Sequence, residues 1–130
     1  MGPILRPVLK DVMWVGAGGA VGSALRYLVW RAVGTSGGFP WATVFVNVTG
    51  SFLLGLLAGV YAGRVGPTMR VAVFFGFLGG YTTFSTFTSE TVVLARTGSA
   101  VGAFGNVAVS LVAGLAAALA GVLLGESLSS

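Results

Sequence analysis

The stretch Gly79-Gly-Tyr-Thr-Thr-Phe-Ser-Thr-Phe-Thr-Ser-Glu90 decides how this chain can fold. It lies in a long apolar segment, yet six of the eight residues from Thr82 to Ser89 carry a hydroxyl group. Paired glycines followed by β-branched and hydroxyl residues form a poor continuous helix. We therefore predict a helix that is broken near Gly79 to Thr83. The alternative is an unbroken helix whose hydroxyls bond back to the preceding turn.

The rest of the chain is strongly apolar. Of its 130 residues, 55% are hydrophobic and only 8% are charged, against about 25% charged in an ordinary globular protein, and the mean hydropathy is +0.97. A transmembrane helix needs about 20 mostly apolar residues, so four spans with short connectors use nearly the whole chain. We predict an all-α membrane protein with a single domain, residues 1–130, and transmembrane helices at about 11–33, 41–63, 70–95 and 99–124.

The composition also excludes most enzyme chemistry. The chain has no His and no Cys, which removes His-based acid–base catalysis, thiol nucleophiles and the usual zinc sites. Its acidic residues, Asp11, Glu90 and Glu126, are too scattered for a two-carboxylate site. The Lys and Arg residues lie one or two at a time between apolar blocks, which indicates loop anchoring rather than a nucleic-acid face. We expect no enzyme and no nucleic-acid partner.

The basic residues bias the orientation in the membrane only weakly. The side with both termini has Arg6, Lys10, Arg64 and Arg70, and the opposite side has Arg31, Arg96 and, if it is counted, Arg26. Because an excess of Lys and Arg marks cytoplasmic loops, a near balance allows insertion in both orientations and pairing as an antiparallel dimer. The alternative is a fixed topology with both termini in the cytoplasm.

Glycines recur four residues apart in all four spans. The pairs and triplets are Gly18 and Gly22; Gly55, Gly59 and Gly63; Gly76 and Gly80; and Gly121 and Gly125. Small residues at this spacing let helix backbones approach closely. We expect tightly packed helices, within one chain or between chains.

Further polar residues lie within the predicted spans. Thr43 and Asn47 are four residues apart and so share a helix face; the Asn47 amide can join helices or donate to a ligand. Arg26 and Glu90 also lie inside spans and could pair. In the fourth span a stripe at four-residue steps is suited to close packing or to lining a narrow path; it comprises Gly102, Asn106, Ser110 and Gly114.

Two aromatic residues accompany the hydroxyl-rich run. Phe84 and Phe87 are three residues apart and share a face if this part of the chain is helical. Such a pair ordinarily packs in a core or against lipid. An aromatic ring also has a positive edge that can face an anion without binding it tightly, which suits conduction.

Long parts of the chain resemble one family. The run Gly76-Phe-Leu-Gly-Gly-Tyr-Thr-Thr-Phe-Ser-Thr-Phe87, followed by Glu90-Thr91, resembles the signature of the Fluc fluoride channels, also called the CrcB family. Val46-Asn47 with Gly50-Ser51-Phe52, and Gly18-Gly19 through Arg26-Tyr27, fit the same family in the same order. The resemblance covers essentially the whole chain.

The resemblance implies a function and an assembly. It implies selective, passive export of fluoride by a multi-pass protein in the lipid bilayer of the inner (cytoplasmic) membrane of a microbial cell. It also implies an antiparallel, dual-topology homodimer with two separate fluoride pores. A sodium ion at the dimer centre would be held by backbone carbonyl groups that correspond here to Gly79 and Thr82.

The resemblance also implies roles for side chains. The ring edges of Phe84 and Phe87 would face fluoride, with Asn47 as the donor beside them. The hydroxyl groups of Thr43, Thr83 and Ser110 would complete the pore. Arg26 would make the entrance electropositive. The fourth span departs from the family, because Asn106 stands where an aromatic hydroxyl is expected and Gly114 where a serine often occurs.

Two other functions remain open from the residues alone. A small dual-topology multidrug exporter has the same size but needs a membrane-embedded carboxylate in its first helix, where this chain has only Asp11 at the very end. A non-transporting membrane subunit is favoured by the glycine-rich faces and disfavoured by the hydroxyl-rich run.

Overall fold

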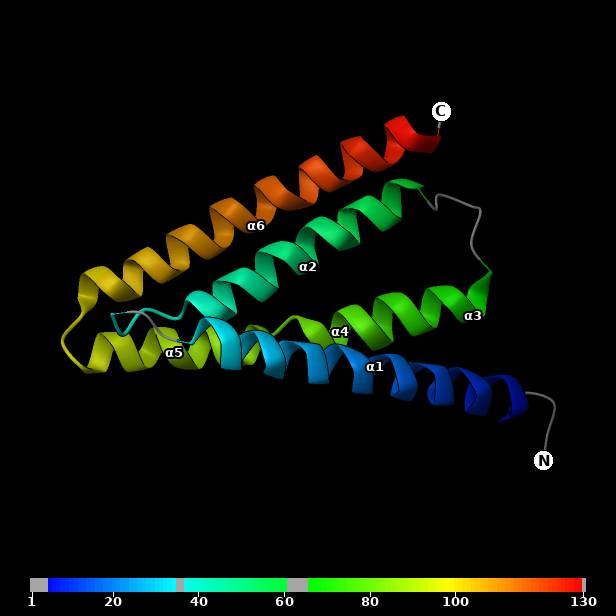
Figure 1. Ribbon diagram of the computed structural model, residues 1–130, viewed down its shortest axis with the longest axis horizontal. Coiled ribbons are helices and arrows are strands. Elements are labelled where there is room, and N and C mark those ends of the chain that lie inside the picture. The colour runs from blue at the N-terminus through cyan, green and yellow to red at the C-terminus, as the bar shows by residue number, and fades with distance from the viewer. Residues whose placement is uncertain (1–4, 35–36, 61–65, 130) are drawn as a thin grey trace.

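The chain folds into helices joined by short connectors. The computed structural model describes residues 5–34, 37–60 and 66–129. In chain order the elements are α1 (Leu5–Val33), α2 (Trp41–Val60), α3 (Pro67–Arg70), the π-helical segment η1 (Val71–Leu78), α4 (Gly79–Tyr81), α5 (Phe84–Arg96) and α6 (Ala100–Ser129). The elements from α3 to α5 follow one another along one elongated segment, residues 67–96 (Figure 1).

In the part of the chain that the structure describes, four helical stretches are long and apolar enough to cross a membrane. They are Pro7–Val33, Trp41–Val60, Pro67–Arg96 and Ala100–Ser129. The prediction of an all-α chain with four membrane-spanning helices is therefore confirmed. The helices at the two ends of the chain are longer than the predicted spans, since α1 begins at Leu5 and α6 continues to Ser129. Gly63, the predicted end of the second span, and Arg64 lie outside the described residues.

Glycines end two of the helices. Gly34 follows α1 with φ +60° and donates its N–H to Trp30 O at 3.0 Å. Gly98 lies in the connector between α5 and α6 with φ +87° and donates to Ala95 O at 3.4 Å. A glycine adopts this left-handed backbone without steric cost, so it can end a helix within a short connector.

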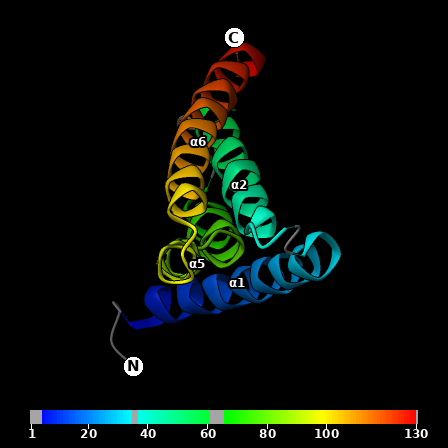
Figure 2. The ribbon, with the colours of Figure 1, turned by 90° about the vertical axis from the view of Figure 1, so that its left-hand side faces the viewer.

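The helices pack in two groups. In one group α2 lies along α6, and in the other α1 lies along η1 and α4 (Figures 1 and 2). The glycines of these helices lie against the backbone of the neighbouring helix. A Cβ added to Gly59 would lie 2.5 Å from Val122 O, and one added to Gly80 would lie 2.6 Å from Gly19 O. Such distances leave no room for a side chain. The four-residue glycine patterns therefore act within this chain, by bringing helix backbones together.

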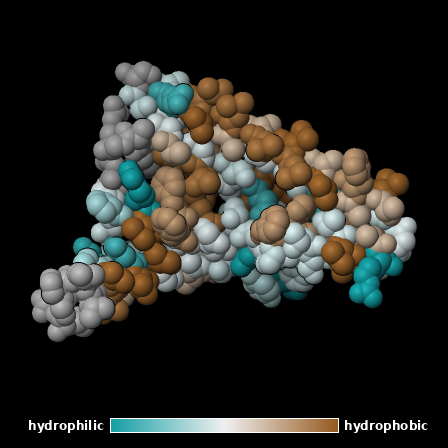
Figure 3. All heavy atoms as spheres, turned by 180° about the vertical axis from the view of Figure 1, so that it is seen from behind, coloured by the Kyte–Doolittle hydropathy of each residue, from teal (hydrophilic) through white to brown (hydrophobic). Residues whose placement is uncertain are grey.

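The outer surface is apolar. On α6, Val101, Phe104, Val112 and Leu115 are each at least 70% exposed. Hydrophobic side chains spread along the length of the face shown in Figure 3. Many exposed apolar side chains of this kind are typical of a protein surrounded by lipid. By contrast, the polar residues Thr43, Thr83 and Asn106 are buried.

Substitution of Gly121 by alanine tests the close packing of α2 on α6. The new Cβ would meet Phe52 O and lie 2.7 Å from Leu56 N. We expect Gly121→Ala to lower the free energy of unfolding by about 1 to 3 kcal/mol, as overpacking does, measured by thermal unfolding in detergent.

Gly114→Ala is the matched control on the same helix. Its new Cβ would lie 3.8 Å from Ser51 Oγ, an ordinary contact, so this variant should be as stable as the wild-type protein. Equal stability of the two alanine variants would show that the glycine contacts do not determine the helix packing.

Candidate functional site

Two extended residues separate α4 from α5. Thr82 has φ −82° and ψ 159°, and Thr83 has φ −151° and ψ 113°. We call these two residues the Thr82–Thr83 linker. Both are β-branched, which favours extended backbone. The linker lies midway along residues 67–96. Thr82 N–H still donates to Leu78 O at 3.0 Å, but the backbone groups of Thr83 need partners other than those of a regular helix.

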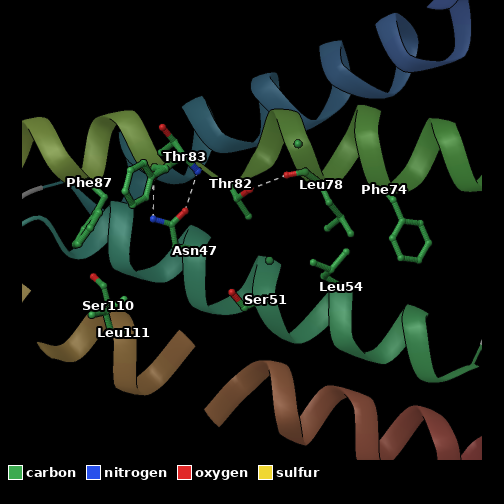
Figure 4. A pocket seen from close by; sticks show the side chains of 13 residues that line it. Asn47, Ser51, Leu54, Phe74, Leu78, Thr82, Thr83, Phe87, Ser110 and Leu111 are labelled. Atoms are coloured by element: carbon green, nitrogen blue, oxygen red, sulfur yellow. Dashed lines mark hydrogen bonds between the residues drawn. The ribbon is translucent and has the colours of Figure 1, made fainter. Parts of the chain in front are cut away.

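The side chain of Asn47 supplies those partners from α2. Its Nδ2 donates to Thr83 O at 3.0 Å, and its Oδ1 accepts from Thr83 N–H at 2.8 Å (Figure 4). A single amide group thus pairs with both backbone groups of one residue, as a neighbouring strand would. The amide has one more N–H, which no described residue accepts. Asn47 also lines the adjoining pocket.

The threonine hydroxyls stabilise the two helix ends. Thr82 Oγ1 donates to Leu78 O at 2.9 Å, in the last turn before the linker. Thr83 Oγ1 accepts from Thr86 N–H at 3.3 Å, which caps the N-terminus of α5. The hydroxyl-rich sequence therefore ends one helix and begins the next.

The linker also approaches α2 closely at Gly50. A Cβ on Gly50 would collide with Thr82 Cγ2. At the residues directly before these two, Thr49 Oγ1 and Tyr81 Oη lie 2.9 Å apart and are hydrogen-bonded. These contacts hold α2 against the linker, so that Asn47 reaches Thr83.

The N–H groups of Thr83 and Thr86 do not make their usual helical bonds. In a regular helix the N–H of Thr83 would bond to Gly79 O, but here it donates to Asn47 Oδ1. The N–H of Thr86 would bond to Thr82 O, but it donates to Thr83 Oγ1. Carbonyl oxygens freed in this way suit a hard cation. Among the described residues there is no group of three acidic, His or Cys side chains that could hold a metal ion instead.

A pocket of about 350 Å³ opens beside the linker (Figure 4). Its wall combines α2, the segment 67–96 and α6, and all of its residues are uncharged. Of the residues singled out from the sequence, the pocket brings together seven: Asn47, Gly79, Thr82, Thr83, Phe84, Phe87 and Ser110. The others in the wall are Gly50, Ser51, Leu54, Phe74, Leu78 and Leu111.

Phe84 and Phe87 lie together in this wall. Their ring centroids are 5.8 Å apart at an interplanar angle of 45°. They differ in exposure, since Phe87 is 9% exposed and Phe84 is 76% exposed. Phe87 therefore belongs to the wall within this chain, whereas Phe84 presents most of its ring to the outside.

Thr43 and Arg26 line a second pocket, of about 310 Å³. It lies between α1, α2 and α5 and shares Thr83 with the first pocket. Thr43 Oγ1 donates to Glu90 Oε1 at 3.0 Å, and Glu90 Oε2 is buried with no hydrogen-bond partner among the described residues. The sequence left open whether Glu90 pairs with Arg26. In the structure its hydrogen-bond partner is Thr43.

Sequence reasoning missed several partners. The pairing of Asn47 with the Thr83 backbone was not foreseen, although an isolated amide in an apolar span signals that a partner is needed. Asn106, treated as part of a stripe, is completely buried and donates to Thr91 Oγ1 at 2.8 Å. These contacts join different helices and have no signature in sequence spacing.

Comparisons with known proteins agree on one family. Residues 13–122 match the model of the family described as CrcB-like protein, Camphor Resistance (CrcB). The chain is 48% identical over 122 residues to a protein of Chlorobaculum tepidum named fluoride-specific ion channel FluC, with 92% of this chain and 97% of that protein covered.

Two further relatives carry related names. The fluoride-specific ion channel FluC of Rhizobium meliloti is 43% identical over 120 residues, which cover 89% of this chain and 96% of the relative. The fluoride-specific ion channel FluC 2 of Bacillus licheniformis is 41% identical over 122 residues, which cover 93% of this chain and 91% of that relative. With the family model matching most of its length and these relatives matching nearly end to end, the chain belongs to the CrcB family.

Proposed function

We propose that this protein is a fluoride-specific ion channel that exports fluoride passively across the inner membrane of a cell. The observation that carries the proposal is the Thr82–Thr83 linker, held by Asn47 beside an uncharged pocket with two phenylalanines in its wall. The choice of fluoride as the ion rests on the names of the relatives, which are fluoride-specific ion channels. The family match gives no support to a multidrug exporter or to a non-transporting subunit.

The chemistry of the pocket suits a small, strongly hydrated anion. Removing water from fluoride costs much free energy unless other hydrogen-bond donors replace it. The pocket offers the second N–H of Asn47 and the hydroxyl groups of Ser51 and Ser110. None of these carries a charge, so binding remains weak enough for the ion to leave, as conduction requires.

The phenylalanines complete the proposed pathway. The edge of an aromatic ring is weakly positive, and the tilted rings of Phe84 and Phe87 offer edges in different directions. The N-terminus of α5 begins at Phe84 and has no acidic residue in its first turn. The positive end of this helix dipole therefore adds to an environment that favours an anion.

The second pocket serves as the entrance in this proposal. Arg26 gives it a positive charge, and Thr43 and Thr83 supply hydroxyl groups. Since Thr83 lines both pockets, an anion attracted by Arg26 reaches the Asn47 site past this one residue. The linker is then the break of the third transmembrane helix around which the pathway is built.

The surface supports assembly of two chains. Phe84 is 76% exposed, although the proposal places its ring edge beside the ion. A second chain could enclose this ring, and the near balance of Lys and Arg on the two sides allows that chain to be inverted. We therefore include an antiparallel, dual-topology homodimer with two pathways in the proposal.

A sodium ion at the centre of that dimer fits the residues at the linker. The N–H groups that would bond to Gly79 O and Thr82 O in a regular helix donate elsewhere. Sodium bound there would supply a fixed positive charge. In this proposal the chain contributes the two carbonyl oxygens. They are available because the N–H groups of Thr83 and Thr86 bond instead to Asn47 Oδ1 and Thr83 Oγ1.

Ion efflux from liposomes tests the function directly. Purified protein reconstituted in liposomes should release fluoride rapidly and retain chloride, because the donor-lined path replaces the hydration shell of the smaller ion. Ion-selective electrodes measure both ions, and protein-free liposomes are the control. Retention of fluoride by folded, inserted protein would refute the proposal.

Replacement of the phenylalanines tests the pathway. Phe84→Ile and Phe87→Ile should each largely abolish fluoride efflux, because isoleucine fills similar space without a positive edge. The same electrode assay measures the loss, and size-exclusion chromatography checks that the oligomer is unchanged.

Phe104→Ile is the matched control. Phe104 lies on α6 and is 76% exposed, as Phe84 is, but it lines neither of the two pockets. It should conduct as the wild-type protein does. Wild-type efflux in both Phe84→Ile and Phe87→Ile would remove the phenylalanines from the pathway.

A further inference from the structure

Asn106 connects two walls of the pocket without lining it. Its side chain is on α6 and has no exposed surface. Asn106 Nδ2 donates to Thr91 Oγ1 at 2.8 Å, and Thr91 Oγ1 donates to Phe87 O at 2.7 Å. On the other side, Ser110 Oγ donates to Asn106 Oδ1 at 3.5 Å. Phe87 and Ser110, at the two ends of this chain of hydrogen bonds, both line the pocket.

The hydroxyl of Ser110 differs from other hydroxyls on these helices. Thr49 and Thr91 each donate to the carbonyl four residues earlier at 2.7 Å, and Ser127 donates to Leu124 O at 2.8 Å. Such a bond occupies the hydroxyl proton. Ser110 instead makes a long bond to a side-chain oxygen. A bond of 3.5 Å is at the weak limit for a hydrogen bond, so the hydroxyl readily rotates to donate to another acceptor.

We propose that Asn106 is a positioning residue that keeps the Ser110 hydroxyl available to donate to an anion in the pocket. Asn106 Oδ1 gives the hydroxyl an acceptor at 3.5 Å, and this long bond keeps Ser110 from being committed to a backbone carbonyl. Thr91 holds the amide of Asn106 in the orientation that presents Oδ1 to Ser110. The proposal rests on the proposed function, which makes fluoride the anion.

A purely structural role is the competing explanation. The bond between Asn106 and Thr91 joins α6 to α5, so its loss could loosen the helix contact and lower the flux through any pathway. The two explanations differ in their dependence on Ser110. If Asn106 acts through the Ser110 hydroxyl, its replacement has no effect once that hydroxyl is gone.

A double-mutant cycle separates them. We would measure the initial fluoride efflux rate from liposomes at low internal fluoride for Asn106→Leu, Ser110→Ala and the double variant. Leucine is close to asparagine in size and lacks the acceptor. Each single variant should lower the rate about fivefold, the effect of one hydrogen bond, and the double variant should match Ser110→Ala.

Threonine variants of α5 provide a second test and its control. Thr91→Val removes the group that orients the Asn106 amide and should lower the rate in the wild-type background but not in Ser110→Ala. Thr88→Val removes a hydroxyl that donates to Ser85 O within α5, and it should conduct normally. This pair also decides the question if Asn106→Leu does not fold.

The outcomes distinguish the two proposals. Losses that multiply in the double variants, or a wild-type rate in Asn106→Leu, would overturn the positioning role and leave the channel intact. Absence of fluoride efflux from the wild-type protein would overturn the proposed function itself.

Discussion

The pair of hydrogen bonds between the Asn47 side chain and the Thr83 backbone is the interaction on which the rest of the site depends. An unpaired backbone N–H or C=O in the apolar interior of a membrane costs several kcal/mol. Two consecutive extended residues create such groups within the segment 67–96. One amide of α2 pairs with both backbone groups of Thr83, so these two extended residues are accommodated beside the pocket.

The pairing in turn depends on how closely the helices approach. Gly50 faces Thr82 with no room for a side chain, and the hydrogen bond between Thr49 and Tyr81 fixes the same region of α2. Glycines on α2 and α6 bring the fourth span against the second, which places Ser110 in the same pocket wall as Asn47. Small residues thus determine the backbone distances, and the few polar residues then meet across them.

Much of the fold follows from local sequence. Four apolar stretches predict four membrane-spanning helices, because length and hydropathy are properties of each stretch alone. The run of hydroxyls and glycines makes residues 79–83 a poor continuous helix, and the structure has extended backbone at Thr82 and Thr83. Phe84 and Phe87 share a face because of their spacing, and the structure brings their rings together.

The partners within the site could not be predicted in the same way. Asn47 is on α2 and Thr83 is in the linker, and the pairs Thr43 and Glu90, and Asn106 and Thr91, each join two different helices. Which polar groups meet depends on the rotation and depth of each helix, and sequence periodicity does not determine either. The sequence therefore identified which residues need partners, and the structure shows which partners they have.

The exchange of the Thr83 amide hydrogen tests the central role of Asn47 most directly. NMR of the protein in lipid nanodiscs would compare the wild-type protein with Asn47→Leu, which keeps the volume of the side chain and loses its amide. We predict that exchange at Thr83 becomes at least about tenfold faster, the effect of losing one strong hydrogen bond, while amides in the middle of α5 stay protected. Equal protection of Thr83 in the two proteins would contradict the account.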